Sequence, residues 1–174
     1  MMMSRFLRAA SLAAAIACVT APAMAADDPS LFTVGAGLWD VNFNYDHQVL
    51  EGRFEFQSGL GLFETDSFGG LKPMVGLMAN TLGSKFVYGG FAAPFDLGGN
   101  QRWYFTPSAG VGAYSRGAGL DLGGTFEFHL GVNLAYAVTS GSRVGLYLTH
   151  ISNAGINGHN PGENSLLLTW AFAL

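Results

Sequence analysis

A histidine and a serine two residues apart, His150 and Ser152, stand near the C-terminus within the stretch THISNAGINGHNPGEN. A serine hydroxyl becomes a nucleophile when a neighbouring imidazole accepts its proton, so this pair could carry out acyl transfer. Side chains two residues apart on a strand point the same way, with Cα atoms ~7 Å apart, and an imidazole can lean across that distance. The Asn- and Gly-rich segment that follows offers amide and backbone N–H donors for an oxyanion.

The elements that must position this pair are strands. Charged residues make up only 11% of the 174 residues, and 25 residues are glycine. After the N-terminal leader, no apolar run approaches the ~18 residues of a membrane-spanning helix. Alternation of apolar and polar residues, interrupted by Gly, Asn, Asp and Ser, predicts eight strands. They are 31–42, 47–58, 70–81, 84–96, 102–115, 124–138, 142–153 and 164–174; residues 59–69 either prolong the second strand or form a long turn.

The alternation assigns two different faces to each strand. Phe126, Phe128, Leu130, Val132 and Leu134 share one face of their segment, and Glu127, His129 and Asn133 share the other. A soluble β-sandwich would show the same pattern. The low charge, the many glycines, the aromatic segment ends and a secretory leader favour an eight-stranded antiparallel transmembrane β-barrel, apolar outside and polar inside. Eight strands leave an interior just filled by side chains. We therefore expect packed ion pairs in the lumen, involving Glu51, Arg53, Glu55, Arg102 and Glu127.

The N-terminus predicts export. Arg5 and Arg8 precede an apolar segment that ends at Ala23-Met24-Ala25, which is typical of a signal peptide cleaved after residue 25. Residues 26–174 would then form the barrel. The alternative, a lipoprotein acylated at Cys18, is disfavoured because Ala15 stands where a leucine is usual. Loss of the two arginines leaves 6 basic and 12 acidic residues, a net charge of −6. An acidic chain without a basic patch argues against nucleic acid as a partner.

Strand phase predicts that the His–Ser pair faces lipid. Val144, Leu146 and Leu148 share the phase of His150 and Ser152. An even number of strands brings both termini to one side of the membrane, normally the periplasm, so the strand 142–153 ends at the cell surface. Polar groups that face hydrocarbon are costly. His150 and Ser152 are among the last residues of this strand, which places them level with the headgroups of the outer leaflet. In Gram-negative bacteria these headgroups belong largely to lipopolysaccharide.

The stretch THISNAGINGHNPGENSLLL resembles the lipid A 3-O-deacylase (PagL-type) family of outer-membrane enzymes, whose hallmark is a His-x-Ser-Asn near the C-terminus. The resemblance extends more weakly through YGGFAAPF, FTPSAGVGAY and DLGGTFEF. It implies an eight-stranded barrel that hydrolyses the ester-linked acyl chain at the 3-position of lipid A, without metal or cofactor. By motif position Ser152 would be the nucleophile and His150 the general base. Asn160 and the backbone from Asn153 to Gly155 would be the oxyanion donors.

Two neighbouring residues, Glu163 and Asn164, are candidates for the group that orients His150. The family typically uses an acid early in the last strand. Asn164 shares the outward phase of Leu166 and Leu168, whereas Glu163 is out of phase by one but lies beside a turn, where strand parity does not bind. We expect Glu163 to supply the charge, with Asn164 as the alternative third member.

Two other functions remain compatible with the sequence: a structural or adhesive barrel without chemistry, and a barrel acyltransferase that moves a chain from phospholipid. The histidines outside the pair, His47, His129 and His159, form no metal-ligand pattern. The sequence leaves open whether the protein is a monomer or a homodimer.

Overall fold

The computed structural model describes residues 29–41 and 48–174. The predicted signal peptide 1–25, with Cys18, and His47 lie outside the described residues. The strands are β1 (Leu31–Trp39), β2 (Val49–Gln57), β3 (Lys72–Asn80), β4 (Lys85–Ala92), β5 (Phe95–Asp96), β6 (Trp103–Ser115), β7 (Phe126–Thr139), β8 (Ser142–Ser152) and β9 (Glu163–Ala173). In the described part of the chain, no helix is long and apolar enough to cross a membrane.

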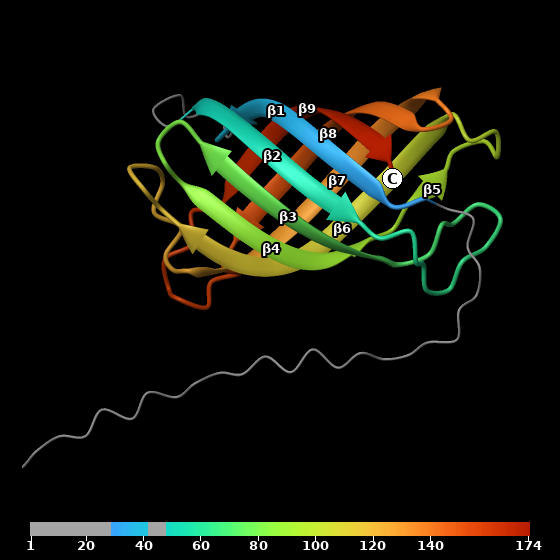
Figure 1. The fold of residues 1–174 in the computed structure, drawn as a ribbon. Coiled ribbons are helices and arrows are strands. Elements are labelled where there is room, and N and C mark those ends of the chain that lie inside the picture. Colours follow the sequence, from blue (N-terminus) through green and yellow to red (C-terminus); the bar gives the residue numbers. More distant parts are fainter. Residues whose placement is uncertain (1–28, 42–47) are drawn as a thin grey trace, which may run out of the picture.

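The strands close into an antiparallel barrel (Figure 1). The sheet runs in the order β4-β3-β2-β1-β9-β8-β7-β6-β5, and β4 also pairs with β6, which closes the ring. The short β5 continues the path of β4 along the same neighbour, β6. Pro94 lies at the break, where a residue without a backbone N–H cannot donate to the ladder. The predicted segment 84–96 is therefore one barrel strand in two pieces, and the predicted eight-stranded antiparallel barrel is confirmed.

The two ends of the barrel differ. Leu174 donates its N–H to the carbonyl of Ser30, 2.9 Å away, so β1 begins where the chain ends. We call this the terminal end and the opposite one the far end. β8 runs toward the far end and stops at Ser152. At the terminal end, β2 stops at Gln57, so residues 58–71 form a long connection rather than a prolonged strand.

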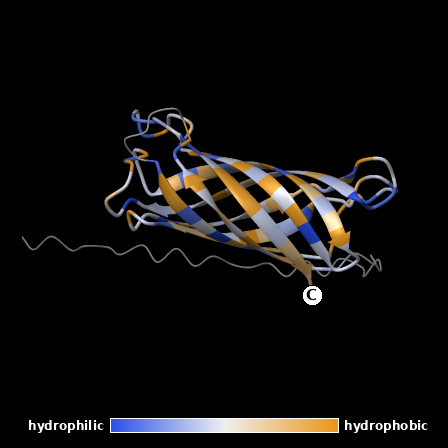
Figure 2. Cartoon of the chain, turned by 90° about the horizontal axis from the view of Figure 1, so that it is seen from above, coloured by the Kyte–Doolittle hydropathy of each residue, from blue (hydrophilic) through white to orange (hydrophobic). Residues whose placement is uncertain are grey.

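The barrel wall has the predicted polarity, and Figure 2 shows hydrophobic and hydrophilic residues alternating along the strands. On β7 and β8, Leu130 is 54% exposed and Leu146 is 57% exposed, whereas Glu127 and His129 are fully buried. Apolar side chains cover the outer surface on every long strand. Soluble monomers rarely expose apolar patches of more than a few hundred Å². This wall is suited to lipid rather than to water.

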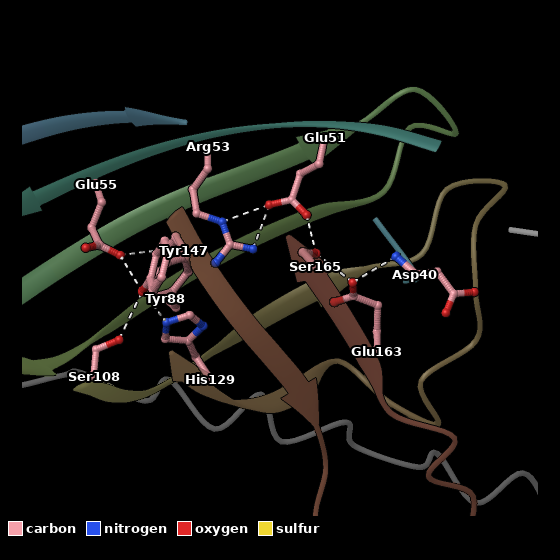
Figure 3. A network of polar contacts seen from close by, with 10 residues as sticks. All are labelled: Asp40, Glu51, Arg53, Glu55, Tyr88, Ser108, His129, Tyr147, Glu163 and Ser165. Carbon is pink, nitrogen blue, oxygen red and sulfur yellow. Dashed lines mark hydrogen bonds and ion pairs between the residues drawn. The ribbon is translucent and has the colours of Figure 1, made fainter. Parts of the chain in front are cut away.

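A polar network (Figure 3) occupies part of the lumen, beside a cluster of buried apolar side chains around Phe86. Arg53 is buried and pairs with Glu51 at 2.6 Å, and its guanidinium carbon lies 5.7 Å from the ring centres of both Tyr88 and Tyr147. The hydroxyl of Tyr88 donates to Glu55 at 2.9 Å. The predicted lumen ion pair is thus confirmed for Glu51 and Arg53, while Glu55 is held by tyrosines.

Two further charges predicted for lumen ion pairs, Arg102 and Glu127, also behave differently. The prediction for Arg102 is wrong: its side chain is exposed at the terminal end and donates to the hydroxyl of Tyr136 at 2.9 Å. It precedes β6, and strand alternation does not govern a loop residue. Glu127 does face the lumen, but no hydrogen-bond partner reaches its carboxyl oxygens within the described part of the chain.

Arg53 is the cation on which this network depends. We expect Arg53→Ala to destabilise the barrel by about 3–5 kcal/mol, because it leaves buried carboxylates without a counter-charge. Urea unfolding in detergent micelles measures this change. The matched control is Arg116→Ala, since Arg116 pairs with Asp121 at 3.1 Å but is 58% exposed. Its loss should cost less than about 1 kcal/mol. Equal losses in the two variants would contradict the assigned role of Arg53.

Candidate active site

His150 and Ser152 lie on the outer wall at the far end of β8. Both are half-buried and share the phase of Leu148, which is 52% exposed. Across the strand pairs, His150 lies opposite Leu130 on β7 and opposite Asn164 on β9. The pair therefore faces sideways from the barrel and not into its lumen.

Asn164 holds the imidazole. Its Oδ1 lies 2.9 Å from Nδ1 of His150. An amide oxygen only accepts, so Nδ1 carries the proton and Nε2 is left as the basic nitrogen. The backbone of Asn164 is fixed as well, because its carbonyl accepts the N–H of Val41 at 2.9 Å.

The expectation that Glu163 orients His150 is wrong in this structure. Glu163 is the first residue of β9 and lies opposite Ile151, so its side chain points into the lumen, where it is fully buried. Its Oε1 accepts the N–H of Asp40 at 3.1 Å and lies 2.6 Å from Oγ of Ser165 (Figure 3). Strand pairing already begins at Glu163, so strand parity turns Glu163 inward and Asn164 toward His150.

Ser152 and His150 point to the same side of β8, but their side chains are not hydrogen-bonded to each other. Within residues 48–174, no hydrogen bond joins Oγ of Ser152 to the ring of His150. Hydrogen bonds of catalytic groups are often long without substrate and tighten when it binds.

The turn after β8 uses its own donors. The backbone N–H of Asn153 donates to Oδ1 of Asn160 at 3.0 Å, and the N–H of Gly155 donates to Oδ1 of Asn153 at 2.9 Å. Of the backbone groups expected as oxyanion donors, the N–H groups of Asn153 and Gly155 are therefore engaged. Asn160 is exposed, and because its oxygen accepts this bond, its NH₂ end points elsewhere and can donate.

Asn153 ties the turn to a second loop. Its side chain is fully buried and donates through Nδ2 to the carbonyls of Leu122, at 2.6 Å, and His159, at 2.8 Å. Leu122 belongs to the connection between β6 and β7 and is itself fully buried. The role of Asn153 is thus to position the turn that carries Asn160.

Gly162 is a site residue that the sequence reasoning missed. Its φ is +67°, and a Cβ built there would lie 2.9 Å from Cε1 and 3.5 Å from Nε2 of His150. Only a residue without a side chain lets the imidazole rest against the turn. The signal available in the sequence was its place directly before Glu163, but glycine in a turn more often serves the backbone alone.

We expect Gly162→Ala to lower activity far more than Gly158→Ala. Gly158 lies in the same turn with a φ of +73° and open space where its Cβ would be. Both changes carry the strain of a left-handed alanine, about 1 kcal/mol, but only the first displaces His150. A drop in kcat of ~10-fold or more is expected for Gly162→Ala, because a small misplacement of a reacting group is costly. Equal rates in the two folded variants would contradict this role.

An apolar groove on the outer wall leads to the histidine. Leu130, Val132 and Leu148 line it, with Pro107 on β6, and His150 and Asn164 lie at one end. The groove runs from the far end toward the middle of the wall. It is suited to a hydrocarbon chain whose polar attachment sits beside the histidine.

The remaining histidines lie apart. His129 is buried in the lumen, and His159 is exposed in the turn after β8. Among residues 29–41 and 48–174, no three His, Cys, Asp or Glu side chains gather closely enough to hold a metal ion.

A closed barrel with an apolar wall, and a Ser and a His on that wall above an apolar groove, define a membrane-embedded barrel with a lipid-facing site. Residues 37–173 match the family model described as "Lipid A 3-O-deacylase (PagL)", and the chain belongs to this family. The resemblance seen in the sequence is thereby confirmed, and with the fold it places the protein in the outer membrane.

Individual relatives agree with this assignment. The chain is 32% identical over 74 residues to the lipid A deacylase PagL of Bordetella bronchiseptica strain RB50; this match covers 41% of the chain and 42% of that protein. A crystal structure of the outer membrane enzyme PagL superposes with a TM-score of 0.65 at 17% identity, over 83% of this chain and 99% of the other. Neisserial surface protein A gives 0.53 at 13% identity, over 83% and 97%. These two structural matches support the fold alone.

Proposed function

We propose that the protein is an outer-membrane esterase that hydrolyses the 3-O-linked acyl chain of lipid A. The observation that carries this proposal is the hydrogen bond between Asn164 and Nδ1 of His150 on the lipid-facing wall, two residues before Ser152. It prepares the imidazole as a base where an acyl chain in the outer leaflet would lie. Family membership supplies the substrate.

Acylation begins at Ser152. Its Oγ attacks the ester carbonyl carbon of the 3-O-acyl chain, and Nε2 of His150 takes the hydroxyl proton. The carbonyl oxygen becomes an oxyanion, toward which the NH₂ of Asn160 donates. When the tetrahedral intermediate collapses, the bond to the sugar oxygen breaks. His150 returns its proton to that oxygen, which leaves as the 3-hydroxyl of the sugar.

Deacylation repeats the same steps with water. Water gives a proton to His150 and attacks the acyl-serine carbonyl, and the bond to Oγ of Ser152 then breaks as His150 returns the proton to Oγ. The products are a free fatty acid and the regenerated serine. Headgroup depth matters here, because water is present among lipid headgroups, whereas the hydrocarbon beside the apolar lining of the groove holds none. The groove holds the acyl chain while the ester stays beside the base.

The third member of the proposed triad is a neutral amide. Asn164 fixes the tautomer and the ring orientation of His150, but it brings no negative charge to stabilise the imidazolium that forms during the reaction. The site therefore departs from the acid that the family typically carries at this place. We infer a Ser-His-Asn triad that works more slowly than one with a carboxylate.

Mass spectrometry of lipid A from Gram-negative cells that express the protein tests the proposal. We expect lipid A to lose one 3-hydroxyacyl group, from the 3-position, relative to cells that express the Ser152→Ala protein. A gained acyl chain would assign the acyltransferase function instead. Unchanged lipid A, with the barrel folded in the outer membrane, would favour a barrel without chemistry.

A further inference from the structure

The connection between β2 and β3, residues 58–71, is long for the terminal end of a barrel. β7 and β8 are joined there by Ser140 and Gly141 alone. Outer-membrane barrels generally keep their periplasmic turns short. We call residues 58–71 the β2–β3 loop.

The tip of the β2–β3 loop presents apolar side chains outward. Phe63 is 79% exposed, Leu60 is 69% exposed and Leu62 is 46% exposed. Phe63 also has a φ of +63°, a conformation that is costly for a bulky residue. A ring this exposed would gain free energy by moving from water into an apolar environment.

The β2–β3 loop is shaped by its own bonds. Leu62 and Leu71 exchange backbone hydrogen bonds of 3.1 and 2.8 Å, and the ring of Phe68 stacks on that of Phe95 with centroids 4.9 Å apart. On the inner side, Nζ of the buried Lys72 donates to the carbonyl of Gly59 at 3.0 Å. These bonds hold the β2–β3 loop in place, and its exposed side chains include the apolar Leu60, Leu62 and Phe63, followed by the polar segment 64–67.

This apolar tip continues the lipid-facing wall. Leu71 shares the outward phase of Val75 and Leu77, and Leu62 lies opposite Leu71. Leu71 lies four residues before Val75 in the chain, about 13 Å closer to the terminal end. The apolar row thus continues from the wall to the terminal end of the barrel. The charged residues of the loop, Glu64 and Asp66, are both acidic, which argues against attraction to anionic lipid.

We propose that the β2–β3 loop inserts Leu60, Leu62 and Phe63 into the phospholipid leaflet at the periplasmic end of the barrel. The occupant of this surface is the boundary between headgroups and acyl chains of zwitterionic phospholipid. Amphipathic surface segments bind this boundary by burying their apolar face in it. The anchor lies at the end of the barrel opposite to His150 and does not depend on deacylation.

Site-directed spin labelling tests the insertion. A Cys18→Ser background is otherwise free of cysteine, so Phe63→Cys gives one nitroxide site. The labelled barrel is reconstituted in phosphatidylcholine–phosphatidylethanolamine vesicles, and collision rates with oxygen and with an aqueous nickel chelate are measured. Leu77→Cys on the lipid-facing wall, where Leu77 is 43% exposed, and Asn100→Cys in the polar loop of the same end are the controls.

We expect the oxygen-to-nickel ratio at position 63 to approach that at 77 and to exceed that at 100 severalfold. A ratio at 63 equal to that at 100 would place the tip in water and overturn the proposal. Protection of position 63 from both reagents would also overturn it, because a second barrel or another protein would then cover the tip.

Discussion

Ser152→Ala is expected to reduce deacylation by ~10⁴-fold or more, since removal of a triad nucleophile leaves only binding and oxyanion stabilisation. The lipid-facing position of Ser152 at the end of β8 gives the loss a simple physical reason. No other hydroxyl of β8 lies beside His150: Thr149 faces the lumen and is 1% exposed. The rate is measured on purified lipid A in detergent, with release of the 3-hydroxy fatty acid as the readout.

The control for this loss is a serine on the same strand. Ser142 begins β8 at the terminal end, where its Oγ lies 2.9 Å from Oγ1 of Thr139. Ser142→Ala should keep full activity. Each variant must migrate faster in gel electrophoresis before heating than after it, as a folded barrel does. Product at the wild-type rate from folded Ser152→Ala protein would refute the mechanism.

The double variant tests whether the pair acts as one unit. His150→Ala alone should cost about as much as Ser152→Ala alone, because a hydroxyl without a base is a poor nucleophile. If the two groups work together, the double variant should be no slower than either single one. Multiplication of the two losses would mean that the residues act independently, and Ser152 would then not transfer its proton to His150.

Strand phase was the strongest predictor of this structure. The alternation of Phe126, Glu127 and their neighbours predicted which side chains fill the lumen, because a period of two leaves a paired strand no other choice. The same rule placed His150 on the outer wall. The weaker predictions concerned residues at strand ends, such as Arg102. Strand pairing stops there, and the alternation of faces therefore no longer applies.

The conformation of the turn between β8 and β9 could not be predicted from the sequence, for a different reason. Its shape depends on the bond from Asn153 to Leu122, two residues on separate loops that only the closed barrel brings together. That bond decides which amides stay free, and it leaves Asn160 rather than the backbone of Gly155 as a donor. The contact of Gly162 with His150 likewise exists only once β8 and β9 are paired in register.

The choice between Glu163 and Asn164 shows how such an error arises. A family pattern with an acid at this place favours the nearest carboxylate, and a residue in a turn is not bound by strand parity. In the structure β9 is already paired at Glu163, opposite Ile151. A rotation that brought this carboxylate outward would break its bonds to Asp40 and Ser165.

Variants at Asn164 and Glu163 therefore separate the two hypotheses. Asn164→Ala should lower kcat by ~10²-fold, because the imidazole loses both its tautomer and its orientation. Glu163→Gln should keep the rate within about twofold, since an amide can fill the same place in the lumen and the carboxylate does not touch His150. A large loss in Glu163→Gln with little loss in Asn164→Ala would return the role of third member to Glu163.

Asn164→Asp turns the same position into a test of charge. A hydrogen bond to an ionised acceptor is worth about 1 kcal/mol more than a neutral one, which corresponds to roughly a fivefold rate increase if the gain falls on the imidazolium in the transition state. A carboxylate costs little at headgroup depth. We therefore expect Asn164→Asp to be faster than the natural protein, an unusual result for a change in a triad. The natural Asn164 would then be a residue that orients His150 without stabilising its charge. If Asn164→Asp is as slow as Asn164→Ala, the amide NH₂ group of Asn164 is itself required, and the hydrogen bond from His150 is not what makes this residue matter.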